Sequence, residues 1–349
     1  MKNLMLALFI FAMSHHGFAQ TDSIIVIEST EHKAEQLYNS GVKSFESANY
    51  IEAIKYLQLS ILEDIHFSDA YFLLSHIQKE NTTYMDAIQT LHDYVLVNDR
   101  KDTAYYLIAE IYYQNEIKDS ATQYLNLCIQ QNPNFFSAYY LKSQIHFALK
   151  EYEEAIYNLS RTIHLQPAFS HAYNDRASAH RMLGNNEKAL EDYARAILME
   201  KNSIYYSNRG SIYLKLEKFT EAIQDYSQAL SLNPNYYLAL NNRGVAKMET
   251  KDYAGAIKDF SLCLEIKNDY YPALSNRGIA YYKAKQYQEA INDFNTLIER
   301  IPSDGINYLH RGNTKEMLRD AEGACQDWEK AAELGVEAAK NYLNNQCKP

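Results

Sequence analysis

Five arginines and five aspartates recur together along the second half of the chain, and they are the residues best suited to bind a charged group. A row of guanidinium groups would bind an anion, whereas an Arg beside a carboxylate forms a planar bidentate bridge. We favour the bridge, because every Arg has one matching acid and an unpaired buried charge is costly. Each Asp follows its Arg by 16 residues, and the pairs are Arg176 with Asp192, Arg209 with Asp225, Arg243 with Asp259, Arg277 with Asp293, and Arg311 with Asp327.

No sequence motif for catalysis accompanies these pairs. The chain lacks the glycine-rich phosphate loop, the G-x-G-x-x-G turn, the H-E-x-x-H zinc pair and the G-x-S-x-G nucleophile elbow. Its histidines scatter over unrelated positions, and its cysteines form no C-x-x-C pair. We therefore expect no enzyme activity, no cofactor and no bound metal.

The elements that position the Arg/Asp pairs repeat with a period of 34 residues. Nine repeats begin at residues 34, 68, 102, 136, 170, 203, 237, 271 and 305, and the one that begins at residue 170 has 33 residues. The twentieth position is Ala in all nine repeats, the eighth is small, and the twenty-fourth is large and apolar. Small residues let two antiparallel helices approach closely, and the large residue fills the space beside them. Position 32 ends the second helix in four repeats, at Pro133, Pro167, Pro234 and Pro302.

This pattern resembles the tetratricopeptide repeat family over residues 34–338, which is 305 of 349 residues. The resemblance implies an all-α fold, a right-handed superhelical solenoid of nine helix hairpins with one concave face. Two regions are expected within it, because repeats 1–4 (residues 34–169) lack the Arg/Asp pair and repeats 5–9 (residues 170–338) carry it. The Arg lies on the first helix of its hairpin and the Asp on the second, so the two side chains are expected to meet across the hairpin.

In this family the first helix of each repeat lines the concave face. Carried over to this sequence, that assignment gives an aromatic groove in the early repeats and a row of asparagines in the late ones. Aromatic side chains offer rigid contact area, and Asn amides grip an extended peptide because they both donate and accept. The alternative is that Asn in the row only caps or solvates its helix. The candidate groove residues are Tyr38, Phe45, Phe72, Tyr106, Tyr113, Tyr140, Phe147, Asn208, Asn242 and Asn276.

A capping helix is predicted at the end of the array, in residues 339–349. Gly335 marks the end of the last hairpin, and apolar residues follow it at helical spacing. Cys325 lies ten residues before Gly335 and Cys347 lies twelve after it, so an antiparallel hairpin would bring the two together. We predict a Cys325–Cys347 disulfide. Cys128 and Cys263 occupy a small core position and are expected to be buried free thiols.

Residues 1–19 have the pattern of a secretory signal peptide. Lys2 is followed by an apolar run from Leu4 to Met13 and by small residues up to Ala19. That run is shorter than the roughly 20 residues that a membrane span needs. Residues 20–33 form a lead-in to the first repeat. We expect an exported, soluble protein of the periplasm or the extracellular space, where a disulfide is stable.

The charge balance bears on the partner. The chain has 34 basic and 44 acidic residues, for a net charge of −10. Non-specific nucleic-acid binding relies on Lys and Arg, so neither nucleic acid nor an anionic membrane is expected as a partner. Together with the groove residues, the resemblance predicts a non-enzymatic scaffold that binds an extended peptide or a partner helix. Two alternatives stay open: a glycan-binding accessory protein of the cell envelope, and a non-catalytic regulatory subunit of an envelope assembly.

Overall fold

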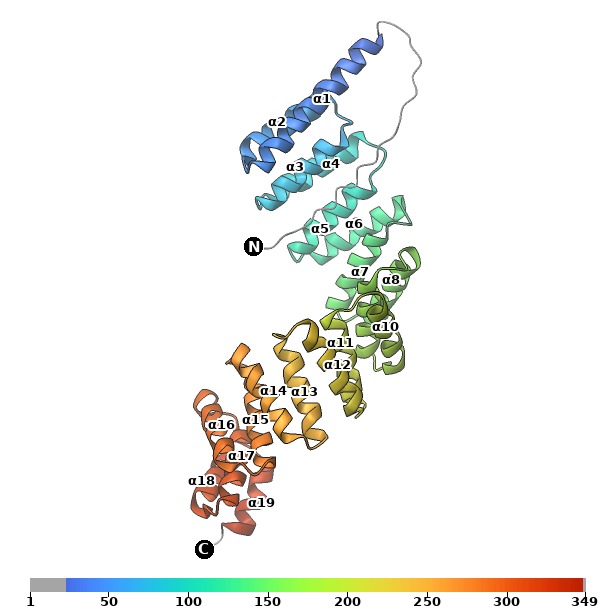
Figure 1. Cartoon of the computed structure of the whole chain (residues 1–349). Helices are drawn as coiled ribbons and strands as arrows, with labels where there is room; N and C mark the ends of the chain where they lie inside the picture. The colour runs from blue at the N-terminus through green and yellow to red at the C-terminus, as the bar shows by residue number, and fades with distance from the viewer. Residues whose placement is uncertain (1–22, 348–349) are drawn as a thin grey trace. The chain divides into compact units, whose positions relative to one another are not determined.

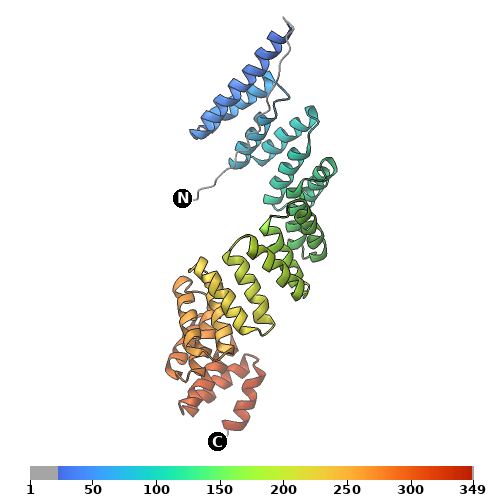
Figure 2. The same ribbon diagram turned by 45° about the vertical axis from the view of Figure 1, so that its right-hand side comes forward.

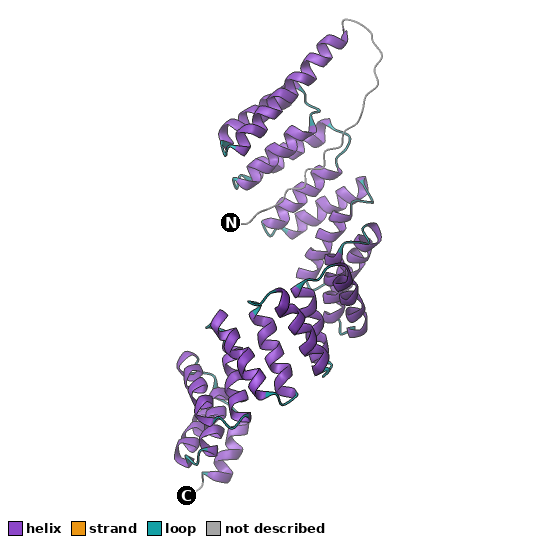
Figure 3. Ribbon diagram, viewed as in Figure 1, coloured by secondary structure: helices purple, strands orange, loops and turns teal. Residues whose placement is uncertain are grey.

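The computed structural model describes residues 23–347, and all regular secondary structure in that range is helical (Figure 3). The predicted signal peptide lies outside the described residues. No helix in the described range is both long and apolar enough to cross a lipid bilayer. The helices are α1 (Ser23–Glu46), α2 (Tyr50–Glu63), α3 (Ser68–Glu80), α4 (Tyr84–Val97), α5 (Asp102–Gln114), α6 (Lys118–Gln131), α7 (Phe136–Ala148), α8 (Tyr152–Leu165), α9 (Ser170–Met182), α10 (Asn186–Met199), α11 (Ser203–Lys215), α12 (Phe219–Leu232), α13 (Tyr237–Glu249), α14 (Tyr253–Ile266), α15 (Tyr271–Lys283), α16 (Tyr287–Arg300), α17 (Gly305–Met317), α18 (Ala321–Glu333) and α19 (Glu337–Gln346).

The chain divides into two compact units, Met1–Leu141 and Lys142–Pro349, and the boundary falls within α7. Helices α1–α6 belong to the N-terminal unit and α8–α19 to the C-terminal unit. Within each unit, consecutive helices pair as hairpins, and successive hairpins lie side by side (Figures 1 and 2). The predicted all-α repeat fold is therefore confirmed. Helix α1 begins at Ser23, within the segment 20–33 that the sequence identifies as a lead-in.

Close approach of the two helices in a hairpin depends on the small residue at position 8. A Cβ atom added to Gly244 would lie 2.6 Å from the ring of Phe260, and one added to Gly312 would lie 2.8 Å from the ring of Trp328. Both rings occupy position 24 and are almost fully buried. Because a protein interior is close-packed, a larger residue at position 8 would displace the ring. The small and large positions recognised in the sequence are therefore in direct contact.

Each of the nine hairpins turns at position 15, where the backbone is left-handed. Gly184 has φ 78°, but the same turn is made by a non-glycine residue in the other eight repeats. In repeat 2, Thr82 has φ 62°, and the turn is closed by hydrogen bonds from the N–H of Thr83 to the carbonyl of Gln78 and from the N–H of Thr82 to that of Lys79. These two bonds form the helix-ending arrangement that usually uses Gly. The bonds thus keep a strained residue in place.

Replacing Thr82 with Gly is expected to raise the free energy of unfolding by about 0.5–1 kcal/mol. A β-branched residue at positive φ is strained, and Gly removes that strain at some entropic cost in the unfolded chain. Urea unfolding followed by circular dichroism measures the change. The matched control is Gly184→Thr at the equivalent turn, which should lower stability by a similar amount. If Thr82→Gly destabilised the protein, the strain argument would be wrong.

Candidate functional site

Each of the five Arg/Asp pairs forms a bidentate bridge between the two helices of one hairpin in the C-terminal unit. Arg243 Nε donates to Asp259 Oδ2 at 2.8 Å, and its Nη2 donates to Oδ1 at 2.7 Å. The other four pairs make the same two bonds. The carboxylates are buried, and burial raises the pKa of Asp293 while its hydrogen bonds to Arg277 oppose the rise. These guanidinium groups therefore join the helices of the fold, as the bridge interpretation requires.

Four of the arginines also connect neighbouring repeats, a contact that sequence reasoning missed. Arg243 Nη1 donates to Ser227 Oγ, on the second helix of the preceding repeat, at 3.1 Å. The equivalent acceptors lie at position 25 of each preceding repeat. A recurring polar residue at that position is the sequence pattern that could have predicted this contact. The acceptors are Ser160 for Arg176, Ser261 for Arg277 and Asn295 for Arg311.

Two of the buried aspartates carry a second cation. Lys247 Nζ lies 2.8 Å from Asp259 Oδ2, and Lys315 Nζ lies 2.8 Å from Asp327 Oδ2. Both lysines occupy position 11, one helical turn beyond the Arg of the same repeat. Asp259, only 1% exposed, thus forms ion pairs with two cations, and the cluster of the three side chains keeps a net positive charge.

The predicted asparagine row lies on the successive first helices α11, α13 and α15 and belongs to a set of amide contacts. Asn208 Nδ2 donates to Asn174 Oδ1 at 3.0 Å, and Asn276 Nδ2 donates to Asn241 Oδ1 at 3.1 Å. Asn241 Nδ2 donates in turn to Asn242 Oδ1 at 3.0 Å. Sequence reasoning missed Asn174 and Asn241, which stand one position earlier in their repeats. We call Asn174, Asn208, Asn241, Asn242 and Asn276 the amide face.

The amide face retains hydrogen-bonding capacity. Within the described residues, the side-chain carbonyls of Asn208 and Asn276 accept no hydrogen bond, and each amide uses only one of its two N–H groups. A side-chain amide has two donor hydrogens and an oxygen with two lone pairs. Asn208 and Asn276 are partly exposed, so these groups are accessible to a ligand backbone.

The predicted aromatic groove residues are half-buried, and most of them pack against another ring. In the N-terminal unit, Tyr38 lies edge-on to Phe67 with the ring centroids 5.4 Å apart, and Tyr106 lies 5.2 Å from Phe135. Burial is also the main reason that the pKa of Tyr106 is raised to about 12. Three further residues of this set are also half-buried: Phe72, whose ring centroid lies 4.8 Å from that of Tyr94, and Tyr113 and Tyr140.

Two of the predicted groove aromatics pack at the turn between the helices of their own hairpin. Phe45 lies 6.0 Å from Tyr50, and Phe147 lies 5.4 Å from Tyr152. In each pair the second ring belongs to the first residue of the following helix. Ring contacts within the fold thus account for part of the Tyr-rich composition.

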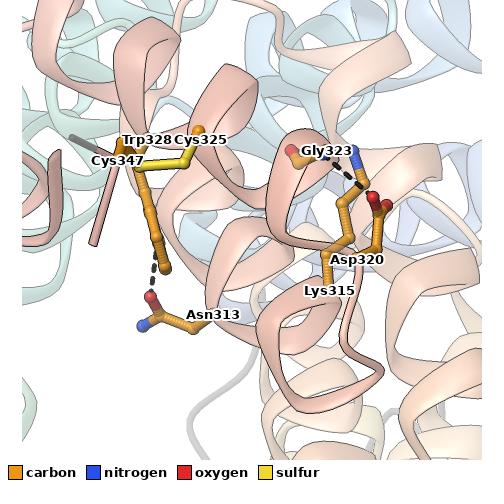
Figure 4. Close-up of a disulfide and its surroundings, with 7 residues drawn as sticks. All are labelled: Asn313, Lys315, Asp320, Gly323, Cys325, Trp328 and Cys347. Carbon is orange, nitrogen blue, oxygen red and sulfur yellow. Dashed lines mark hydrogen bonds between the residues drawn. A yellow bond between two sulfur atoms is a disulfide. The ribbon is translucent and has the colours of Figure 1, made fainter. Parts of the chain in front are cut away.

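Helix α19 closes the C-terminal end of the array, where the sequence predicts a cap. Cys325 of α18 and Cys347 are joined by a disulfide with their Cα atoms 5.8 Å apart. Trp328 stacks on Tyr342 of α19 with the ring centroids 4.9 Å apart. Figure 4 shows the disulfide and the hydrogen bond that Trp328 Nε1 donates to Asn313 Oδ1 of α17 at 2.8 Å. The disulfide and the ring stack together fasten α19 to the last hairpin.

The two other cysteines have buried thiols of low reactivity. Cys128 and Cys263 are buried, and burial raises the pKa of their thiols to about 12 and about 11. Since the thiolate is the reactive and metal-binding form, neither residue is suited to either role at neutral pH. Within the described residues, no group of three or more His, Cys, Asp or Glu side chains is arranged to hold a metal ion.

Helix hairpins of about 34 residues that stack on one another within each unit define an α-helical repeat protein. Family models for the tetratricopeptide repeat match residues 170–203, 203–236, 237–270 and 271–304, in register with the repeats identified in the sequence. A model for anaphase-promoting complex, cyclosome, subunit 3 matches residues 80–162. The chain belongs to the tetratricopeptide repeat family.

Several crystal structures share this fold. The APC/C hetero-tetramer Cut9-Hcn1 is 14% identical with a TM-score of 0.52, over 90% of this chain and 76% of that one. A tetratricopeptide repeat protein from Parabacteroides merdae ATCC 43184 is 19% identical with a TM-score of 0.51, over 71% and 99%. PilW, a type IV pilus biogenesis factor, is 18% identical with a TM-score of 0.52, over 60% and 98%. At these identities the likeness establishes the fold alone. A comparison with curated proteins gives no significant match.

Proposed function

We propose that this protein is a non-enzymatic scaffold that binds an extended peptide or a partner helix along its first helices. The amide face is the observation that carries the proposal. The side-chain amides of Asn208 and Asn276 each donate one N–H to an Asn of the preceding repeat. The carbonyl oxygen and the second N–H of each amide are left to bind a ligand. An extended peptide backbone presents N–H and C=O groups that such amides complement without reading its side chains.

The remaining polar groups support binding rather than catalysis. The five guanidinium groups are bonded to buried carboxylates, and the two free thiols are buried. We further propose that the protein is exported to the periplasm or secreted. The N-terminal pattern of residues 1–19 and the Cys325–Cys347 disulfide both support export, because disulfides persist in oxidising compartments.

The triple variant Asn208→Ala, Asn242→Ala and Asn276→Ala tests the proposal. The partner is first captured by cross-linking in the native cell, and the bound segment is then synthesised and titrated against the purified protein. Each lost hydrogen bond costs about 1 kcal/mol, so the triple variant is expected to bind about 100-fold more weakly. Asn235→Ala, in an exposed turn, is the matched control and should bind as the wild type does.

Undiminished binding by a correctly folded triple variant would overturn the peptide proposal. A glycan-binding protein would instead lose affinity when Tyr106 and Tyr140 are replaced with Ala, and it would be insensitive to the triple Asn change. Ring contacts such as that of Tyr106 with Phe135 reduce the free stacking surface, which favours the peptide proposal over the glycan alternative. A regulatory subunit would use the same amide face, with an enzyme as the captured partner.

A further inference from the structure

A small cavity lies near the C-terminal end of the array, among the helices of the last two repeats. Its volume is about 270 Å³, somewhat below that of a pocket for a drug-sized ligand and suited to a single side chain. We call it the terminal cavity. Its lining comes from α15, α16 and α17 and consists of Ile279, Tyr282, Lys283, Phe294, His310 and Asn313.

One wall of the terminal cavity is apolar and flat. The rings of Phe294 and His310 stack with their centroids 5.5 Å apart and their planes at 19°. Phe294 is 1% exposed and supports the His310 ring, so the accessible surface of this wall comes from His310 and Ile279, which are partly exposed. Burial lowers the pKa of His310, against a smaller opposing effect of Asp304, so the imidazole is neutral at pH 7. This wall therefore favours an aromatic or aliphatic group.

The terminal cavity also presents hydrogen-bond donors, from Lys283 and Asn313. Trp328 Nε1 donates to Asn313 Oδ1, and because an indole N–H can only donate, the amide oxygen is committed to the indole and its NH₂ group is left to the cavity. Within the described residues, no carboxylate lies within ion-pair distance of Lys283. An unpaired ammonium beside an unpaired amide NH₂ is suited to a carboxylate.

One acid lies near the same cavity. Burial and the neighbouring Tyr287 raise the pKa of Tyr282, and the charge of Glu316 adds to that rise. The negative charge of Glu316 is therefore close to the Tyr282 hydroxyl, and a ligand carboxylate is directed away from it, toward Lys283 and Asn313.

From this arrangement we infer that the terminal cavity is a specificity subsite for a peptide in which an apolar side chain stands next to a carboxylate. The apolar side chain packs on His310 and Ile279, and the carboxylate accepts from Lys283 Nζ and Asn313 Nδ2. The inference rests on the proposed peptide-binding function and adds the class of ligand. The amide face binds the peptide backbone whatever its sequence, whereas the terminal cavity selects peptides by their side chains.

The test uses four N-acetylated dipeptides titrated against the whole protein. Acetyl-Phe-Glu-amide carries a side-chain carboxylate, acetyl-Gln-Phe with a free C-terminus carries a terminal one, acetyl-Phe-Gln-amide carries none, and acetyl-Ala-Glu-amide lacks the apolar group. Trp328 is the one Trp of the chain and contacts Asn313, so its fluorescence reports binding. The neutral and the Ala dipeptides are each expected to bind about ten-fold more weakly than the better carboxylate dipeptide.

Lys283→Gln is expected to remove the preference for a carboxylate over its amide. The matched control is Lys215→Gln, because Lys215 is an exposed lysine at the same position of repeat 6 and lies outside the terminal cavity. The stronger of the two carboxylate dipeptides identifies the side-chain or the terminal group as the source. The inference is overturned if neither carboxylate dipeptide binds better than the neutral one, or if both lysine variants behave alike. Either result leaves the proposed function to stand on the triple Asn variant.

Discussion

Replacing Asp259 with Ala is expected to lower the free energy of unfolding by about 3 kcal/mol, near the lower end of the cost of breaking a buried ion pair. Asp259 is 1% exposed, and its carboxylate accepts two hydrogen bonds from Arg243 and forms an ion pair with Lys247. Without it, two cations face each other without an anion. Their side chains are 19% and 18% exposed, so water partly rehydrates them and limits the loss. Urea unfolding measures the change, and hydrogen exchange locates it in α13 and α14.

Two comparisons separate the ion pair from a general effect of losing a buried side chain. Asp192→Ala should cost less, because Asp192 is bridged to Arg176 and, in the described part of the chain, forms no ion pair with a lysine. Replacing Asp259 with Leu together with Arg243→Met and Lys247→Met should recover much of the stability, since apolar residues of similar volume can replace a buried ion network. An unchanged melting temperature of Asp259→Ala would show that the bridge contributes nothing.

Most of the fold was predictable because its determinants recur at fixed positions. Gly244 at position 8 and Phe260 at position 24 must fit one another, and the same constraint in nine repeats makes the period visible. The hairpin turn was less visible, because a residue such as Thr82 adopts a left-handed conformation without being Gly. There the flanking backbone hydrogen bonds override the local preference of the residue.

For the candidate site, the sequence predicts which residues share a repeat position, but it does not predict which of them form hydrogen bonds with one another. The row of Asn208, Asn242 and Asn276 follows from repeat position, but the bond from Asn276 to Asn241 depends on how far each hairpin is rotated against the next. The terminal cavity could not be predicted from the sequence either. It exists because His310 stacks on Phe294 and leaves space beside them, which no local pattern encodes.

Aromatic positions illustrate the same limit. Tyr106 stands at a groove position by its place in the repeat, yet its ring packs on Phe135, which belongs to the turn before the next repeat. A periodic position gives the side of the helix on which a residue lies. It does not give the direction in which a large side chain turns, because that depends on the neighbouring repeat.

Reduction of the Cys325–Cys347 disulfide is expected to release α19 from the last hairpin. The bond closes a loop with a sequence separation of 22, and constraining a loop of that size is worth about 3 kcal/mol. Helix α19 has 10 residues, too few to be stable as an isolated helix in water. Its release would expose Trp328, which is 1% exposed beneath Tyr342. We therefore expect a red shift of the tryptophan fluorescence and fast hydrogen exchange in residues 337–346.

The same change should reach the terminal cavity, because Trp328 fixes the amide of Asn313 by its Nε1–H bond. Dithiothreitol treatment, or the variant Cys325→Ser with Cys347→Ser, is expected to weaken binding of acetyl-Phe-Glu-amide along with the fluorescence shift. The double variant is also the control for the reductant, since dithiothreitol should have no further effect on it. Cys263→Ala should leave α19 and its protection unchanged, because Cys263 is a buried free thiol of α14. If α19 kept its protection and Trp328 its emission after reduction, the ring stack alone would be holding the cap, and the disulfide would have no part in shaping the cavity.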